Sequence, residues 1–90
     1  MLEIIASNQF KRDLKLAQKR GYDMNKLKVV IYVLSRQERL EDKYRDHSLG
    51  GDFKGFRECR IEPDWLLIYR IEEDVLQLFL FRTGTHSDLF

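Results

Sequence analysis

Seven side chains in the second half of the chain have the chemistry to bind and cleave a phosphodiester: His47, Glu58, Arg60, Asp64, Arg82, His86 and Phe90. If they converge, the set suits RNA cleavage without a metal ion. A base takes the proton from a ribose 2′-OH, which attacks the adjacent phosphorus, and an acid protonates the departing 5′-oxygen. Imidazole titrates near neutral pH, so either histidine can give or take a proton. Sequence alone does not show that these residues meet.

The remaining groups of this set have complementary roles and also plainer explanations. Glu58 can act as the base or orient a histidine, Arg60 and Arg82 offer forked donors to phosphate, and Phe90 can stack on a base. Glu58 and Arg60 can instead form a surface ion pair, which contributes only about 0–1 kcal/mol. Arg82 can cap an edge of the core. A single histidine in a loop or at a terminus is often an ordinary surface residue.

The stretch over residues 56–70 must hold part of this set in place. It predicts two strands joined by a tight turn at Glu62-Pro63-Asp64, because proline presets the turn conformation. On the first strand, Glu58 and Arg60 are two residues apart and therefore share a face. The second strand, Trp65 to Ile71, is apolar on both faces, which is typical of a central strand. The pattern thus predicts an acid and a base mounted side by side on a rigid support.

The remaining elements follow from apolar periodicity and capping residues. Ser7 or Asn8 is expected to cap the first helix and Asp23 the second. The predicted elements are an interior strand over 2–6, helices over 9–20 and 24–38, a strand over 75–82 and a single turn at the C-terminal end. The order β-α-α-β-β-β predicts one α+β domain over residues 1–90, with an antiparallel sheet and a two-helix hairpin on one face.

Lys11, Lys15 and Lys19 recur at helical spacing and predict a basic ridge on the first helix. Residues 1–45 hold 11 Lys and Arg against 6 Asp and Glu, whereas residues 46–90 hold 5 against 9. The ridge can contact phosphates or simply confer solubility.

Composition restricts the class of protein. Ninety residues, 43% hydrophobic and 34% charged, fit one folded domain. The single Cys59 excludes an internal disulfide and favours a cytoplasmic protein. No metal-ligand spacing, membrane-spanning run or signal peptide is expected.

Five stretches follow one another along the chain in a characteristic order and spacing. They are Lys15–Arg20, Asp23–Lys28, Tyr44–Gly51, Glu62–Trp65 with Leu67–Tyr69, and Arg82–His86 with Leu89-Phe90. Together they resemble the YafQ branch of the RelE/ParE superfamily, the toxin partners of bacterial toxin–antitoxin pairs, over essentially the whole chain. The resemblance implies the same β-α-α-β-β-β fold, no cofactor, and an endoribonuclease that cuts mRNA in the ribosomal A site and leaves a cyclic phosphate.

The resemblance also implies which residues act. The family's loop histidine matches His47, its strand acid Glu58, its turn aspartate Asp64, its C-terminal histidine His86 and its terminal aromatic Phe90.

The family also has a histidine on the strand before the turn, and Arg60 stands at that position in this chain. It cannot shuttle protons near neutral pH, so its role is limited to binding phosphate or stabilising charge. We therefore expect His86 to be the general acid, with Glu58 or His47 as its complement.

The partners implied by the resemblance are the ribosome with its mRNA and a cognate antitoxin whose acidic or flexible segment covers the toxin. The toxin–antitoxin complex is expected to bind operator DNA through the antitoxin, and no membrane is involved. Two alternatives remain: a toxin that binds a non-RNA target such as gyrase, and an inactive member that only pairs with its antitoxin. Neither needs His47, Glu58 and His86 together.

Overall fold

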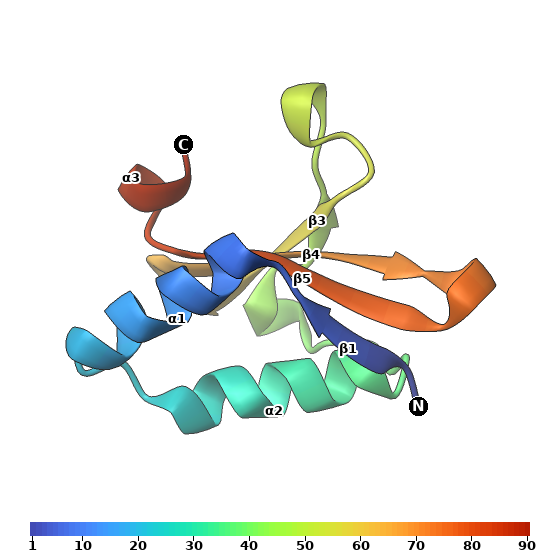
Figure 1. The fold of residues 1–90 in the computed structure, drawn as a ribbon, viewed down its shortest axis with the longest axis horizontal. Coiled ribbons are helices and arrows are strands. Elements are labelled where there is room, and N and C mark those ends of the chain that lie inside the picture. The colour runs from blue at the N-terminus through green and yellow to red at the C-terminus, as the bar shows by residue number, and fades with distance from the viewer.

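The computed structural model describes residues 1–90 as a five-stranded sheet with two longer helices on one face and a short C-terminal helix on the other (Figure 1). The strands are β1 (Glu3–Ala6), β2 (His47–Ser48), β3 (Arg57–Glu62), β4 (Trp65–Glu72) and β5 (Gln77–Gly84). The helices are α1 (Asn8–Lys19), α2 (Met24–Ser35) and α3 (His86–Leu89), with 3-10 turns η1 (Asp42–Tyr44), η2 (Gly51–Phe53) and η3 (Glu73–Val75). The predicted α+β class and the two-helix layer are confirmed.

The strands lie in the order β1-β5-β4-β3-β2, so β4 is central, as its apolar faces predicted. The pairs β2–β3, β3–β4 and β4–β5 are antiparallel, but β1 pairs with β5 in parallel. The prediction of a wholly antiparallel sheet is therefore wrong for the β1–β5 pair. The chain reaches β5 from β1 through both helices and three strands, which allows the parallel pairing. The two-residue β2 is an additional strand that the sequence pattern did not predict.

Both predicted helix caps are present. The Ser7 side chain accepts a hydrogen bond from the Phe10 amide, and the Asp23 side chain accepts one from the Asn25 amide. The second helix ends at Ser35, three residues before its predicted end. Gln37 takes a left-handed conformation with φ of 57°, which ends the helix. The amides of Gln37 and Glu38 then donate hydrogen bonds to the last helical carbonyls.

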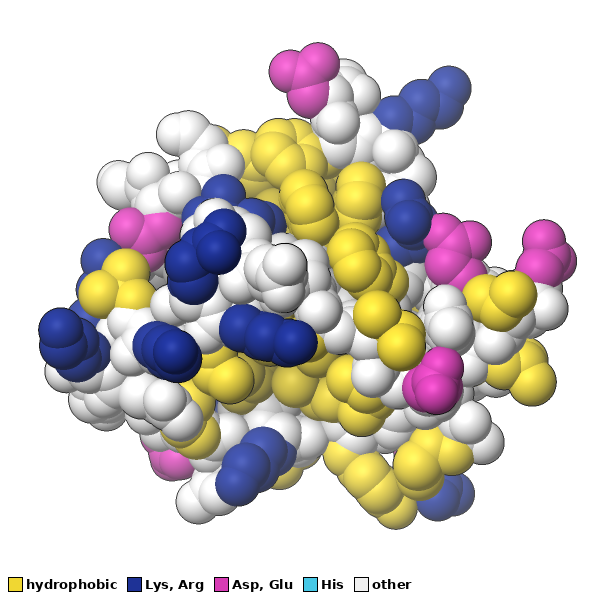
Figure 2. Space-filling view, in the orientation of Figure 1, with side chains coloured by type: hydrophobic (Ala, Val, Ile, Leu, Met, Phe, Trp, Pro, Cys, Tyr) yellow, Lys and Arg dark blue, Asp and Glu magenta, His cyan; other side chains and the backbone are white.

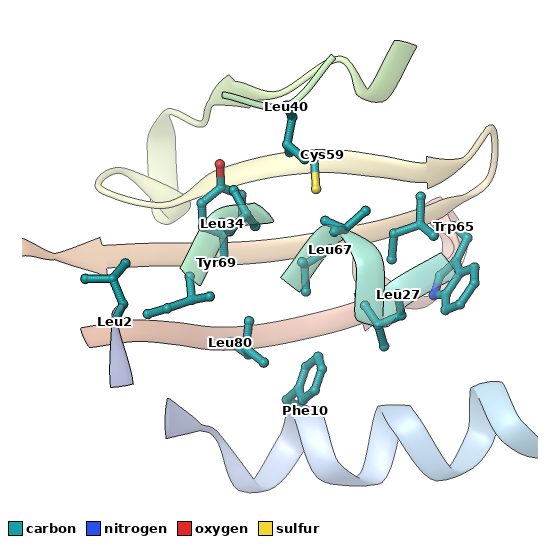
Figure 3. Packing of buried hydrophobic residues seen from close by; sticks show 13 residues of the cluster. Leu2, Phe10, Leu27, Leu34, Leu40, Cys59, Trp65, Leu67, Tyr69 and Leu80 are labelled. Atoms are coloured by element: carbon teal, nitrogen blue, oxygen red, sulfur yellow. The ribbon is translucent and has the colours of Figure 1, made fainter. Parts of the chain in front are cut away.

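The main core lies between the sheet and the two longer helices (Figure 3). Thirteen buried residues form it, including Phe10 of α1, Leu27 of α2, and Trp65 and Leu67 of β4. Burial also raises the pKa of the Cys59 thiol, which keeps it protonated. The core is continuous and anchors the central hairpin from below.

The first strand does not occupy the interior position that its apolar residues predicted. It is an edge strand, and Ile4 and Ile5 remain 48% and 36% exposed. The last strand also begins later than predicted, at Gln77, because residues 73–75 form the 3-10 turn η3. Among the helices, none is long and apolar enough to cross a membrane.

The face of the sheet opposite α1 and α2, which carries the short α3 and is called the α3 face below, has its own small core. Leu66 and Ile68 of β4 pack there against Leu89 of α3, with Leu49, Phe53, Phe56 and Phe81 around them. The C-terminal helix and the loop that contains η2 rise from this face on opposite sides (Figure 1). This face carries most of the residues predicted to act on RNA.

Candidate active site on the α3 face

His86 is the first residue of α3 and is held by the turn between β3 and β4. Asp64 Oδ1 accepts a hydrogen bond from the His86 amide at 3.0 Å and lies 2.6 Å from Nδ1 of its imidazole. These hydrogen bonds, the backbone one foremost, lower the pKa of Asp64, so its carboxylate stays ionised. An ionised carboxylate only accepts, so Nδ1 carries the proton and Nε2 is left free to exchange one.

The short helix that carries His86 is fixed at its start by a capping box. Thr85 Oγ1 accepts a hydrogen bond from the Asp88 amide, and Asp88 Oδ2 accepts one from the Thr85 amide. Gly84 precedes this cap with φ of 158°, and a Cβ there would lie only 2.9 Å from Asp88 Oδ2. The glycine therefore lets the chain pass close to the cap.

Two further contacts tie α3 to the body of the protein. Arg20, just after α1, donates to both carboxylate oxygens of Asp88, at 2.6 and 3.2 Å. These hydrogen bonds lower the pKa of Asp88. Leu89 is buried against Leu66 and Ile68. Arg20 is thus an anchor for α3, a role that sequence reasoning missed because Arg20 and Asp88 are far apart in the chain.

His47 and Glu58 form a second acid–histidine pair, on opposite strands of the β2–β3 ladder. Nε2 of His47 lies 3.7 Å from Oε1 of Glu58, and its Nδ1 lies 2.7 Å from the carbonyl oxygen of Arg45. The carbonyl can only accept, so the Nδ1 proton points to Arg45 and Nε2 faces the carboxylate. Glu58 is 7% exposed, and the 3.7 Å between the two side chains is longer than a hydrogen bond.

Asp46 fixes the backbone next to His47. Its carboxylate accepts hydrogen bonds from the Tyr69 hydroxyl at 2.5 Å and from Arg57 Nη2 at 3.2 Å. Burial and this carboxylate together raise the pKa of Tyr69 and keep its hydroxyl a donor. Sequence reasoning did not single out Asp46. Its position beside His47 was the only signal, because its partners come from two other strands.

Strand register shows how the two pairs relate. His47, Glu58, Ile68 and Arg82 lie in one row across the sheet, and Arg60, Leu66 and Gly84 lie in the next. Leu66 and Ile68 pack against Leu89 on the α3 face, so their strand partners Glu58 and Arg60 share that face, as predicted. His86 and Glu58 are not in contact. Arg60 and Gly84 lie on strands two places apart, roughly 10 Å across the sheet.

Arg82 is drawn instead to Asp13 on α1. Its Nε and Nη2 donate to the carboxylate at 2.8 and 3.2 Å, and the Thr83 amide donates to Oδ2 at 3.2 Å. Burial opposes ionisation of Asp13, but these hydrogen bonds outweigh it and lower its pKa. The contact agrees with the alternative that Arg82 caps an edge of the core. Asp13 was not among the predicted residues, because a lone acid in a basic helix gives no such signal.

The remaining predicted residues lie at the periphery. Phe90 is 59% exposed, and its ring meets that of Phe53 edge-on at 5.3 Å between centroids. Lys11, Lys15 and Lys19 are all exposed on α1, over which Lys and Arg side chains gather (Figure 2). This ridge belongs to the helix layer and is separate from the His47–Glu58 pair. No group of three or more His, Cys, Asp or Glu side chains is placed to hold a metal ion.

Comparison with known proteins matches the chain to a family. A family model described as the bacterial toxin of a type II toxin–antitoxin system, YafQ, matches residues 2–90. The chain belongs to the YafQ toxin family. The resemblance seen in its five stretches is therefore confirmed.

The relatives extend over nearly the whole chain. The mRNA interferase toxin YafQ of Escherichia coli K12 is 46% identical over 89 residues, which cover 98% of this chain and 95% of that protein. Its name agrees with the predicted enzyme class, an endoribonuclease.

Two solved structures share the fold at full length. A metal-bound toxin from Helicobacter pylori has a TM-score of 0.95 and 46% identity, with full coverage of both chains. YafQ in the E. coli DinJ–YafQ complex has a TM-score of 0.90 and 45% identity, covering 100% of this chain and 99% of that one.

Proposed function

We propose that this YafQ-family toxin is a ribosome-dependent endoribonuclease that cuts mRNA in the A site by metal-independent attack of a ribose 2′-OH. The observation that carries the proposal is the contact between His86 and Asp64. It leaves one imidazole nitrogen free on an exposed, anchored helix. Protonated there, His86 acts as the general acid and gives its proton to the departing 5′-oxygen. Asp64 holds the tautomer and stabilises the imidazolium, as carboxylates do in catalytic triads.

Glu58 is the proposed general base. Its carboxylate is buried beside His47, which can take up the proton that Glu58 removes from the 2′-OH. Arg60, two residues further on the same strand face, then binds the phosphate oxygens on which negative charge builds. Arg82 donates hydrogen bonds from Nε and Nη2 to the Asp13 carboxylate, and its Nη1 can donate to the same phosphate.

The separation between the two acid–histidine pairs leaves room for substrate. A ribose and its 3′-phosphate would lie across the face, with the 2′-OH at Glu58 and the leaving oxygen at His86. In-line attack requires the base and the acid on opposite sides of the phosphorus, so direct contact between them is not expected. Phe90 offers an exposed ring face on which a neighbouring base can stack.

The partners follow from the family and from surface charge. E. coli YafQ is known in complex with DinJ, and we infer a cognate antitoxin for this chain, through which the complex binds operator DNA. Lys11, Lys15 and Lys19 form an exposed row that suits the phosphates of ribosomal RNA or an acidic antitoxin segment.

Sequencing of mRNA 5′ ends after a brief pulse of expression tests the proposal. Wild type should produce new ends within translated codons, and His86→Ala should not. Ser87→Ala is the matched control, because Ser87 is exposed in the same helix and forms no side-chain hydrogen bond. Intact messages in growth-arrested cells would instead favour a toxin that binds a non-RNA target. Absence of both arrest and cleavage would favour a chain that only pairs with its antitoxin.

A further inference from the structure

A hollow beside the outer edge of β3 carries an excess of positive charge. It lies between α2, the turn η1 and the end of β3. The residues that line it are Lys26, Val29, Lys43, Tyr44, Arg45, Arg60, Ile61, Glu62 and Pro63. Four of them are cations, and the one acid, Glu62, pairs with Lys26 at 3.3 Å between Oε1 and Nζ. By contrast, the hollow between α1 and the end of β5 balances Arg20 and Arg82 with Asp13 and Asp88.

The hollow is open because the edge strand beside it is short. β2 pairs only with Arg57 and Glu58, so no strand covers β3 from Arg60 onward on that side. An uncovered strand edge presents backbone donors and acceptors to a ligand. With three cations not engaged by an acid in the hollow, Lys43, Arg45 and Arg60, a ligand that fits must be anionic.

Two residues connect this hollow to the proposed catalytic face. Arg45 takes a left-handed conformation, with φ of 50° and ψ of 42°, and its carbonyl oxygen lies 2.7 Å from Nδ1 of His47. A non-glycine residue is rarely found in that region and persists there where surrounding contacts enforce it. Arg60 follows Glu58 on β3 by two residues, about 7 Å along the strand. Arg45 and Arg60, which both line the hollow, therefore lie next to the His47–Glu58 pair.

We propose that this hollow is a second RNA subsite, which binds a phosphate of the strand next to the one that is cut. The inference rests on the proposed function and specifies where its substrate runs. Lys43 and Arg45 neutralise the flanking phosphate, while Arg60 lies between the two subsites. The guanidinium groups of arginine match the geometry of phosphate oxygens. The hollow shares Arg60 with the proposed cleavage face, which favours RNA over an acidic protein segment.

Charge reversal at one lysine tests the subsite, with a lysine elsewhere as the control. Lys43→Glu reverses a charge in the hollow. Lys28→Glu makes the same charge change at an exposed residue of α2 that does not line the hollow. Both are made in His86→Ala protein, so that the RNA stays intact. Binding of a short fluorescent single-stranded RNA is followed by anisotropy over a range of salt concentrations.

Lys43→Glu should weaken binding and reduce the slope of log affinity against log salt by about 0.7, the value for one lost phosphate contact on a single strand. Arg45→Glu should do the same, and Lys28→Glu should leave the slope unchanged. Thermal melting of each variant checks that the fold is intact.

Three outcomes would overturn the subsite: no RNA binding by the parent protein, an equal effect of Lys28→Glu, or no change of slope with Lys43→Glu. Loss of binding to an oligoglutamate peptide with RNA binding unchanged would also overturn it, in favour of an acidic protein partner. If messages stay intact in cells while Lys43 still contributes to RNA binding in vitro, the proposed cleavage fails and the subsite stands.

Discussion

His86 and His47 are both paired with a carboxylate, but the two pairs are built in opposite ways. Asp64 and His86 are both exposed and joined by a short hydrogen bond through Nδ1, so the free nitrogen faces outward. Glu58 is buried and faces the Nε2 of His47 at a longer distance. In the proposed mechanism the first arrangement orients the proton donor, and the second holds the proton acceptor in a buried position. The same two residue types, a histidine and a carboxylate, therefore form pairs that differ in which partner is buried.

Loss of the two histidines should separate these roles most strongly. His86→Ala removes the general acid, and single-turnover cleavage should fall by about 10²–10⁴-fold. His47→Ala leaves the buried carboxylate of Glu58 in place, so its loss should be smaller. Both rates are measured with programmed ribosomes. Equal losses would show that His47, and not Glu58 alone, performs the transfer.

Asp64→Asn should reduce cleavage less than His86→Ala does. The amide keeps the size of the side chain but can no longer stabilise an imidazolium or enforce the Nδ1–H tautomer. A shift of the alkaline limb of the pH–rate profile to lower pH would accompany the lower rate, because that limb reports loss of the proton from the general acid. An unchanged profile would limit Asp64 to holding the backbone of α3 through the His86 amide.

Asp13→Asn tests whether Arg82 serves the fold or the substrate. The change weakens three hydrogen bonds at a mostly buried site and should lower the free energy of unfolding by about 1–3 kcal/mol. Urea denaturation measures this loss. If cleavage per folded molecule stays at the wild-type rate, Arg82 does not depend on Asp13 for catalysis. A matching fall in cleavage would give Arg82 a role at the phosphate.

The smallest expected effect is on stability at low pH. The pKa values of Asp64 and Asp88 are lowered in the folded state. The stability they contribute is therefore full above their unfolded pKa, near 4, and is lost as pH falls through the lower folded values. Arg20→Ala should flatten the dependence of Tm on pH below 4, since it removes the main cause of the Asp88 shift. An unaltered dependence would show that Arg20 does not stabilise α3.

Much of the fold was open to prediction because it depends on short-range rules. The caps Ser7 and Asp23, the turn at Pro63 and the apolar pattern of β4 each act within a few residues, and all four behaved as expected. The end of α2 at Ser35 and the late start of β5 were missed. In both places the backbone takes a left-handed or 3-10 conformation, at Gln37 and over residues 73–75, without glycine or proline to signal it.

The sequence by itself determined the set of reactive groups, the face shared by Glu58 and Arg60, and the family. Only the tertiary structure decided that Asp64 orients His86, that Glu58 lies buried beside His47, and that Asp13 engages Arg82. Each of these contacts joins side chains from elements that the chain order keeps apart. Their distances and burial depend on sheet register and on the packing of α3 against the sheet, and local residue patterns predict neither.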